Sequence, residues 1–223
     1  MRGPLYKVVH SVFIVIAIAL VCQTRLEAST RATNDQICDV SADAALGAED
    51  YIRAIAQHQQ ILAHTPNNAL AHYHLGFAYG MTGRRDLELV EYRTAAELGL
   101  HQWDLYLNLG RANLESTNYP AAADAFANAE ALAPQHSETH FNLGLAYERL
   151  QRFDLAEQEM KTAMRLGANR VSTSNMLAVV YAESGKQAAA RAIWTELARH
   201  ESNRKVARAN LALLDRLILT AAK

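Results

Sequence analysis

Histidines are the residues of this chain best suited to chemistry, because imidazole groups bind metal ions and titrate near neutral pH. The 223-residue chain has nine, and four of them come in close pairs: His72 with His74, and His136 with His140. Residues two apart on a helix point in different directions. A four-residue spacing joins two ligands only when both lie on one helix, and His136 is predicted to end a loop. We therefore expect no metal site and no cofactor, and interpret these histidines as packing or surface side chains.

Other catalytic arrangements are equally weak. Serine, histidine and aspartate occur, but without the glycine-flanked turn that exposes a nucleophilic serine, and no glycine-rich phosphate-binding loop is found. The two cysteines, Cys22 and Cys38, are too few for a disulfide framework or a four-ligand zinc site. A net charge of −1 gives no general attraction to phosphates. The chain is therefore expected not to be an enzyme and not to bind nucleic acid.

The N-terminal segment has the layout of an export signal. Residues 1–28 begin with Arg2 and Lys7, continue with the apolar run Val12–Cys22 and end at a small-residue site, Ala28–Ser29. This run is short for a membrane span, which needs roughly 20 apolar residues. We expect a cleaved signal peptide.

Two alternatives remain open for this segment: an uncleaved N-terminal membrane anchor, or lipidation at Cys22. In each case we expect the body of the protein to be exported to the periplasm, and it meets a membrane only through an uncleaved or lipidated N-terminus. Residues 29–34 form a short polar spacer. Cleavage leaves Cys38 unpaired, either as a small buried side chain or as a partner for another chain.

A repeated pattern organises the rest of the chain. Gly76, Gly110 and Gly144 each follow a leucine at a constant spacing of 34 residues, and a further step reaches Ala178. The same period aligns large residues at Tyr92, Phe126, Met160 and Trp194, small residues at Ala122, Ala156 and Ala190, and prolines at Pro66 and Pro134. A period of 34 is typical of the tetratricopeptide repeat, and the sequence resembles tetratricopeptide-repeat (TPR) proteins. Glu88 stands where the later repeats have alanine, which predicts a looser first hairpin.

The resemblance implies an all-α fold: a TPR right-handed superhelical solenoid of antiparallel helix hairpins. Residues 35–68 are expected to form a degenerate N-terminal repeat. Four repeats then cover 69–204, with bounds of 69–102, 103–136, 137–170 and 171–204. Residues 205–223 read as a helix that caps the exposed face of the last repeat.

The same resemblance implies a binding surface on the concave wall, built by the first helix of each hairpin. The groove residues that it predicts are Tyr73, His74, Phe77, Leu107, Asn108, Arg111, Phe141, Asn142, Leu145 and Arg149. An asparagine there can hydrogen-bond an extended peptide, aromatic side chains can anchor it, and arginine can fork onto a carboxylate. Lysine is absent from these positions, which argues against the two-carboxylate clamp of some TPR domains.

We therefore expect an exported interaction module that binds a protein or peptide in its concave groove, as a scaffold or assembly factor of the cell envelope. The alternative is a fixed accessory subunit of an exported enzyme or secretion complex, which binds through its convex face or its caps.

Overall fold

Eleven helices and no strands make up the residues described by the computed structural model, 39–199 and 204–221. In chain order the helices are α2 (Val40–Gly47), α3 (Tyr51–His64), α4 (Ala69–Met81), α5 (Arg85–Glu97), α6 (Trp103–Glu115), α7 (Tyr119–Leu132), α8 (Ser137–Arg149), α9 (Phe153–Arg165), α10 (Arg170–Glu183), α11 (Gln187–Leu197) and α12 (Arg204–Ala221). The predicted all-α solenoid is confirmed. The expectations for the signal segment, the spacer and both cysteines lie outside the described residues.

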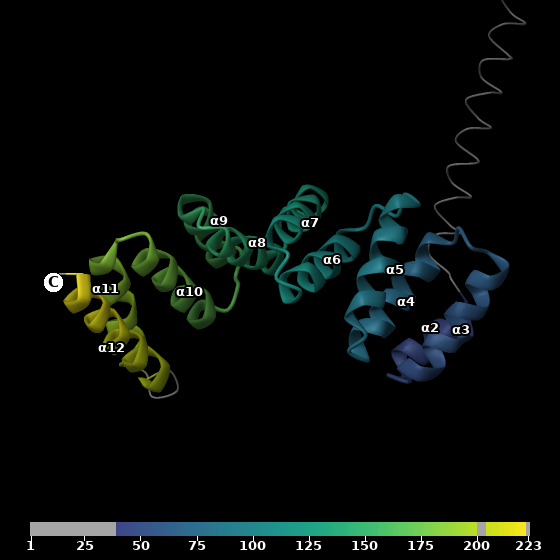
Figure 1. The fold of residues 1–223 in the computed structure, drawn as a ribbon, viewed down its shortest axis with the longest axis horizontal. Coiled ribbons are helices and arrows are strands. Elements are labelled where there is room, and N and C mark those ends of the chain that lie inside the picture. Colours follow the sequence, from purple (N-terminus) through teal and green to yellow (C-terminus); the bar gives the residue numbers. More distant parts are fainter. Residues whose placement is uncertain (1–38, 200–203, 222–223) are drawn as a thin grey trace, which may run out of the picture.

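The helices pack as five successive hairpins along the long axis of the molecule, from α2 and α3 at one end to α10 and α11 at the other, where α12 packs against α11 (Figure 1). Asparagine side chains begin several of these helices. Asn68, Asn118 and Asn169 each accept a hydrogen bond from the backbone N–H three residues ahead, at the start of α4, α7 and α10. Such caps satisfy N–H groups that have no partner within the helix. The first helices α4, α6, α8 and α10 also contact one another in turn and form one continuous wall.

Glycines, which have no side chain, let the two helices of a hairpin approach closely. A Cβ added at Gly76 would lie 2.7 Å from the ring of Tyr92, and one at Gly110 would lie 2.5 Å from the ring of Phe126. Both rings are almost fully buried. The 34-residue pattern therefore pairs a glycine of the first helix with a large core residue of the second, as expected from the sequence.

The first full hairpin is not looser than the others, which corrects the expectation drawn from Glu88. Helices α4 and α5 pack as extensively as α8 and α9 do. Gly80 makes room for the extra carboxylate, since a Cβ added there would lie 2.5 Å from Glu88 Oε1. Arg85 Nη1 donates a 2.8 Å hydrogen bond to Glu88 Oε2. Burial raises the pKa of Glu88, and Arg85 opposes this shift.

Two histidines fasten the proline loops to the hairpins that follow them. In each case the ring Nδ1 contacts a glutamate of the second helix and Nε2 contacts the carbonyl oxygen of the proline. These contacts are His72 with Glu91 (2.5 Å) and Pro66 (2.9 Å), and His140 with Glu159 (2.7 Å) and Pro134 (3.0 Å). The two other repeats have Tyr106 and Ser174 at this position. His72 and His140 therefore have a structural role in these loops.

Candidate functional site

The predicted groove residues lie on three neighbouring helices of the wall, α4, α6 and α8, and they differ in exposure. Arg111 and Arg149 are exposed. Partly buried are Tyr73, His74, Phe77, Asn108, Phe141 and Leu145. Leu107 and Asn142 are buried, at 6% and 9% exposure. The wall therefore offers apolar and aromatic side chains beside two exposed arginines.

Leu107 lies in the core and not on the groove surface. It packs in one apolar cluster with Ala122 and Leu143. Asn142 is almost as inaccessible. Because α6 and α8 each have neighbours on several sides, a small rotation of a helix moves a predicted groove position into the interior. Both side chains lie mostly beneath the surface of the wall, so a ligand in the groove would contact little of either.

A hydrogen bond joins two of the predicted groove residues, Tyr73 and Asn108. Asn108 Nδ2 donates a 3.1 Å hydrogen bond to the Tyr73 hydroxyl, which in turn donates a 3.2 Å bond to Asp104 Oδ2. Burial, together with the nearby Asp104 carboxylate, raises the pKa of Tyr73, so its hydroxyl keeps the proton. This chain of bonds ties α4 to α6 and holds both side chains in a defined orientation within the wall.

The far end of the wall carries a buried acid that sequence reasoning missed. Glu148 is only 3% exposed, and its Oε2 has no hydrogen-bond partner among the described residues. Arg149 Nε lies 3.5 Å from that oxygen. Burial raises the pKa of Glu148 to about 7, and hydrogen bonding with the Glu183 side chain adds to the increase, whereas Arg149 opposes it. No spacing signal marks this pair, because Glu183 belongs to the next repeat.

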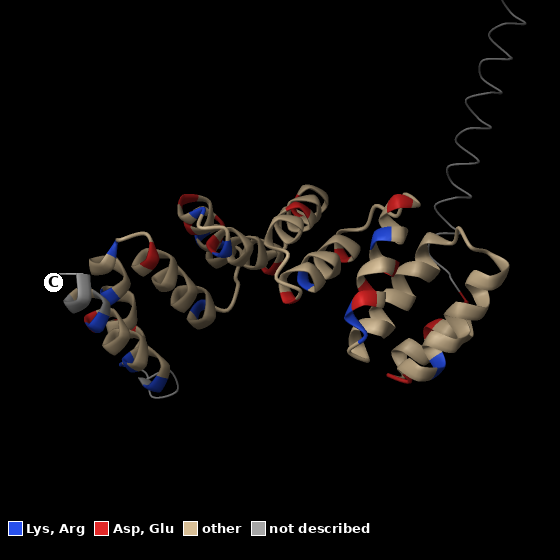
Figure 2. Cartoon of the chain, in the orientation of Figure 1, with Lys and Arg blue, Asp and Glu red and all other residues tan. Residues whose placement is uncertain are grey.

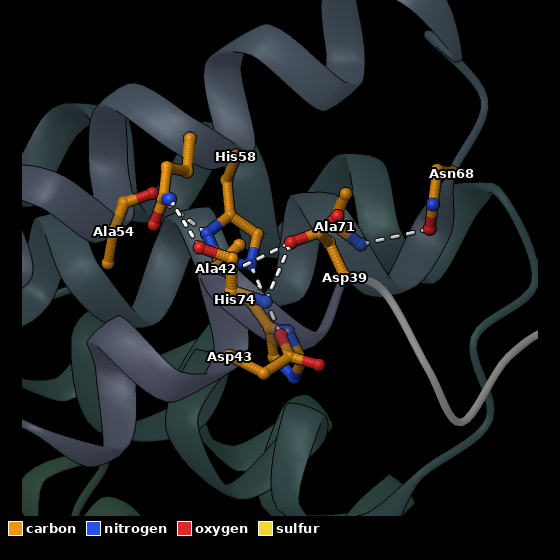
Figure 3. A network of polar contacts seen from close by, with 10 residues as sticks. Asp39, Ala42, Asp43, Ala54, His58, Asn68, Ala71 and His74 are labelled. Atoms are coloured by element: carbon orange, nitrogen blue, oxygen red, sulfur yellow. Dashed lines mark hydrogen bonds and ion pairs between the residues drawn. The ribbon is translucent and has the colours of Figure 1, made fainter.

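The His74 side chain points toward the N-terminal hairpin. There it lies close to two residues that the sequence analysis did not single out. Its Nδ1 lies 2.8 Å from Asp43 Oδ1 of α2, and the same oxygen lies 3.5 Å from His58 Nε2 of α3 (Figure 3). Burial lowers the pKa of His74, although Asp43 acts in the opposite direction. The ring is therefore neutral at pH 7. Residues 43, 58 and 74 sit on three helices, so no motif could reveal their convergence.

Basic and acidic residues both occur along the described solenoid, and α12 carries mainly basic ones (Figure 2). Several are tied in pairs. Arg85 bridges Glu88 and Glu115, and Glu157 accepts hydrogen bonds from Lys161 and Lys186 at 2.6 and 2.7 Å. Such surface pairs contribute little stability individually. Of the helices described, none is long and apolar enough to cross a membrane.

Comparison with known proteins identifies the architecture. Residues 107–170 match the family model described as tetratricopeptide repeat. A crystal structure of MamA protein is 21% identical, with a TM-score of 0.66, over 74% of this chain and 90% of that one. YrrB, described as a TPR protein with an unusual peptide-binding site, is 17% identical with a TM-score of 0.74, over 84% and 97%. MamA from Desulfovibrio magneticus RS-1 is 16% identical with a TM-score of 0.65, over 73% and 92%.

A search of curated proteins returns no match. The similarities in hand therefore establish tetratricopeptide repeats in the middle of the chain and a TPR-type solenoid for the described residues.

Proposed function

We propose that this TPR solenoid is an exported, non-enzymatic interaction module that binds a protein or peptide along the wall of α4, α6 and α8, as a scaffold or assembly factor of the cell envelope. The observation that carries the proposal is the composition of that wall. Partly buried apolar side chains stand beside exposed Arg111 and Arg149, which lie on neighbouring first helices.

The wall predicts the chemistry of the ligand. Phe77, Phe141 and Leu145 are partly open to solvent and offer apolar contacts of the kind that anchor binding partners. The two arginines present planar donors for carboxylates. We therefore expect an extended peptide with apolar side chains and at least one acidic group. Peptide binding is a use of the fold already described for YrrB, which supports the general mode without fixing the sequence recognised.

The binding test uses a synthetic library of extended peptides that vary in apolar and acidic content, titrated against the purified protein. Arg149→Glu is expected to weaken the best acidic peptide by about tenfold or more, because charge reversal replaces attraction with repulsion. Arg165→Glu is the matched control, since Arg165 is also exposed but lies on the second helix α9. Equal losses in both variants, or none in either, would remove the groove from consideration.

Photo-crosslinking in the cell identifies the surface to which the physiological partner binds. A photo-crosslinking residue at Phe141 is expected to give a single dominant adduct that disappears in the Arg149→Glu background. The same probe at exposed Leu155, on the second helix of that hairpin, serves as the comparison. Strong adducts from Leu155 with none from Phe141 would contradict groove binding.

One observation favours the alternative of a fixed accessory subunit. Helix α12 exposes Val206 and Leu213, each with 56% of its surface accessible. Apolar side chains on a terminal helix suit a permanent interface. Under this alternative the protein co-purifies with one partner in a fixed ratio, and Val206→Glu with Leu213→Glu releases that partner. A scaffold that binds through the groove would keep its partner in this double variant.

The proposed export rests on residues 1–28 and needs its own experiment. We expect the mature protein to begin at Ser29, as found by N-terminal sequencing or intact mass, and to be recovered in the periplasmic fraction. A retained N-terminus in the membrane fraction would indicate the anchor, and a lipid-modified Cys22 the lipidated form. Unprocessed protein in the cytosolic fraction would contradict export.

A further inference from the structure

The N-terminal hairpin departs from the other four at the core of its second helix. One period before Tyr92, at the position also held by Phe126, Met160 and Trp194, stands His58. The other four side chains are large and buried, and His58 is also fully buried, at 0% exposure. A titratable ring thus occupies the place where the later hairpins use an aromatic or apolar side chain. Packing alone does not require a histidine here.

Hydrogen bonding fixes the ring of His58 and turns one nitrogen inward. Its Nδ1 lies 2.8 Å from the carbonyl oxygen of Ala54, one turn earlier on α3. Since a carbonyl only accepts, Nδ1 carries the proton and Nε2 of the neutral ring carries a lone pair. Histidine ligands of metal ions commonly have this arrangement, in which the second ring nitrogen donates to a carbonyl and orients the ligand.

Three buried polar atoms converge at this point. His58 Nε2, His74 Nδ1 and Asp43 Oδ1 are buried, and none makes a well-aligned hydrogen bond within the described part of the chain; Asp43 Oδ1 lies 2.8 Å from His74 Nδ1 and 3.5 Å from His58 Nε2. All three lie within 4.8 Å of one another. The two rings stand perpendicular, with centroids 5.3 Å apart. Figure 3 shows the rings of His58 and His74 directed at the carboxylate of Asp43. Leaving such atoms buried and unsatisfied is costly.

A second acidic–histidine cluster, Glu130 with His140 and Glu159, provides an internal comparison. There both ring nitrogens of His140 already donate, one to Glu159 and the other to the Pro134 carbonyl. No nitrogen lone pair remains for a metal ion. The two clusters therefore resemble each other in composition but differ in bonding: His140 uses both ring nitrogens as donors, whereas His58 donates from Nδ1 alone and its Nε2 faces Asp43.

We propose that Asp43, His58 and His74 form a site for a divalent transition-metal ion of the Zn²⁺ type, which joins α2, α3 and α4. Two imidazoles and one carboxylate are the usual ligands of such ions. Ligands at about 2.0–2.1 Å from a tetrahedral ion are about 3.3 Å apart. The Asp43–His58 distance of 3.5 Å already matches this, and the Asp43–His74 distance of 2.8 Å has to widen slightly.

Two of the three side chains of the proposed site are partly open to solvent. The side chains of Asp43 and His74 retain 32% and 20% of their surface, whereas His58 closes the inner side. An ion held there has solvent on its outer side, where a water molecule or a donor from a bound partner completes the tetrahedron. The imidazole ligands favour Zn²⁺, Co²⁺ or Cu²⁺ over Mg²⁺ and Ca²⁺, which prefer oxygen.

The experiment titrates Co²⁺ into tag-free purified protein, because a polyhistidine tag would bind the ion itself. We expect the visible absorption bands of a tetrahedral Co²⁺ site, saturating at one ion per chain and abolished by an equivalent of Zn²⁺ but not by excess Mg²⁺. Calorimetric titration with Zn²⁺ gives the affinity. A chelator should lower the unfolding temperature of the metal-loaded protein, since the ion links three helices.

The variants use residues that other repeats already place at the same positions. His74→Asn introduces the asparagine found at Asn108 and Asn142, and His58→Phe introduces the ring of Phe126. Each should weaken Zn²⁺ binding by more than a hundredfold while leaving the helical circular dichroism unchanged. His64→Asn is the control, because His64 is exposed on the same helix as His58.

Two results would overturn the proposal. One is wild-type protein that takes up no Co²⁺ or Zn²⁺ at millimolar concentration, which would leave the cluster as a buried polar contact. The other is undiminished Zn²⁺ binding in the His74→Asn variant, because the site would then not need this imidazole. Neither result bears on the groove, because the peptide titrations with Arg149→Glu are made separately.

Discussion

The imidazole of His140 donates a 3.0 Å hydrogen bond from Nε2 to the carbonyl oxygen of Pro134, six residues earlier. Through its other nitrogen the same ring reaches Glu159 at 2.7 Å. The exit loop of one hairpin is thereby fastened to the second helix of the next. Burial works against a charge on this ring, but the bonds to Glu159 and Pro134 prevail, and the pKa of His140 is raised.

The raised pKa makes this link dependent on pH. Because the folded protein holds the proton more tightly than the unfolded chain does, the stabilisation is complete below pH 6.5 and is lost as the pH rises through the raised pKa. His140→Ala is expected to cost about 1–3 kcal/mol at pH 6 and less at pH 9. Urea unfolding at both pH values measures this, with His64→Ala as the control. A constant difference across the range would contradict the protonated link.

For Glu148 we predict the opposite effect to that at His140: removing the charge of this side chain stabilises the protein. Its pKa of about 7 exceeds that of an ordinary glutamate, so stability is complete below pH 4.5 and declines as the pH rises through 7. Glu148→Gln is expected to raise the free energy of unfolding at pH 8 by on the order of 1–3 kcal/mol, and to change it little at pH 4.5. Exposed Glu138→Gln should have no such effect at either pH. A loss of stability at pH 8 would show that Glu148 is ionised and paired.

The hairpin crossings predict a graded response to added methyl groups. Gly110→Ala should destabilise by about 1–3 kcal/mol, because its Cβ meets the rigid ring of Phe126 at 2.5 Å. Gly144→Ala should cost less, since the nearest atom is the terminal methyl of Met160 at 2.8 Å, which can move. Gly47→Ala, with nothing within 4 Å, should be neutral or slightly stabilising. Thermal unfolding of the three variants gives the order, and equal effects at positions 110 and 144 would contradict it.

The contact between α12 and the last hairpin can be tested with two adjacent leucines. Leu214 is 2% exposed and packs in one cluster with Trp194, whereas Leu213 is 56% exposed. Leu214→Ala should cost about 2–5 kcal/mol and shift the fluorescence of Trp194 to the red as water reaches the indole. Leu213→Ala should change neither. An unshifted spectrum in Leu214→Ala would mean that α12 does not cover Trp194 in solution.

Much of the fold follows from local rules that the sequence displays. The pairing of Gly110 with Phe126 involves two helices joined by a short turn, so the 34-residue period is enough to predict it. Glu88 shows where this reasoning fails. The register correctly marked it as unusual, but the compensating Gly80 lies outside the positions that define the repeat. The glutamate in place of alanine therefore predicted a looser hairpin, but Gly80 provides the space that the Glu88 side chain needs.

By itself the sequence determined the all-α class, the succession of hairpins and the wall on which a ligand is expected, because these depend on periodicity within one hairpin. Only the tertiary structure decided that Leu107 faces the core, that Tyr73 bonds Asn108, and that His58 and His74 meet at Asp43. Such contacts depend on how each helix is rotated against its neighbours. A rotation of a few tens of degrees is invisible in the period, yet it changes which atoms touch.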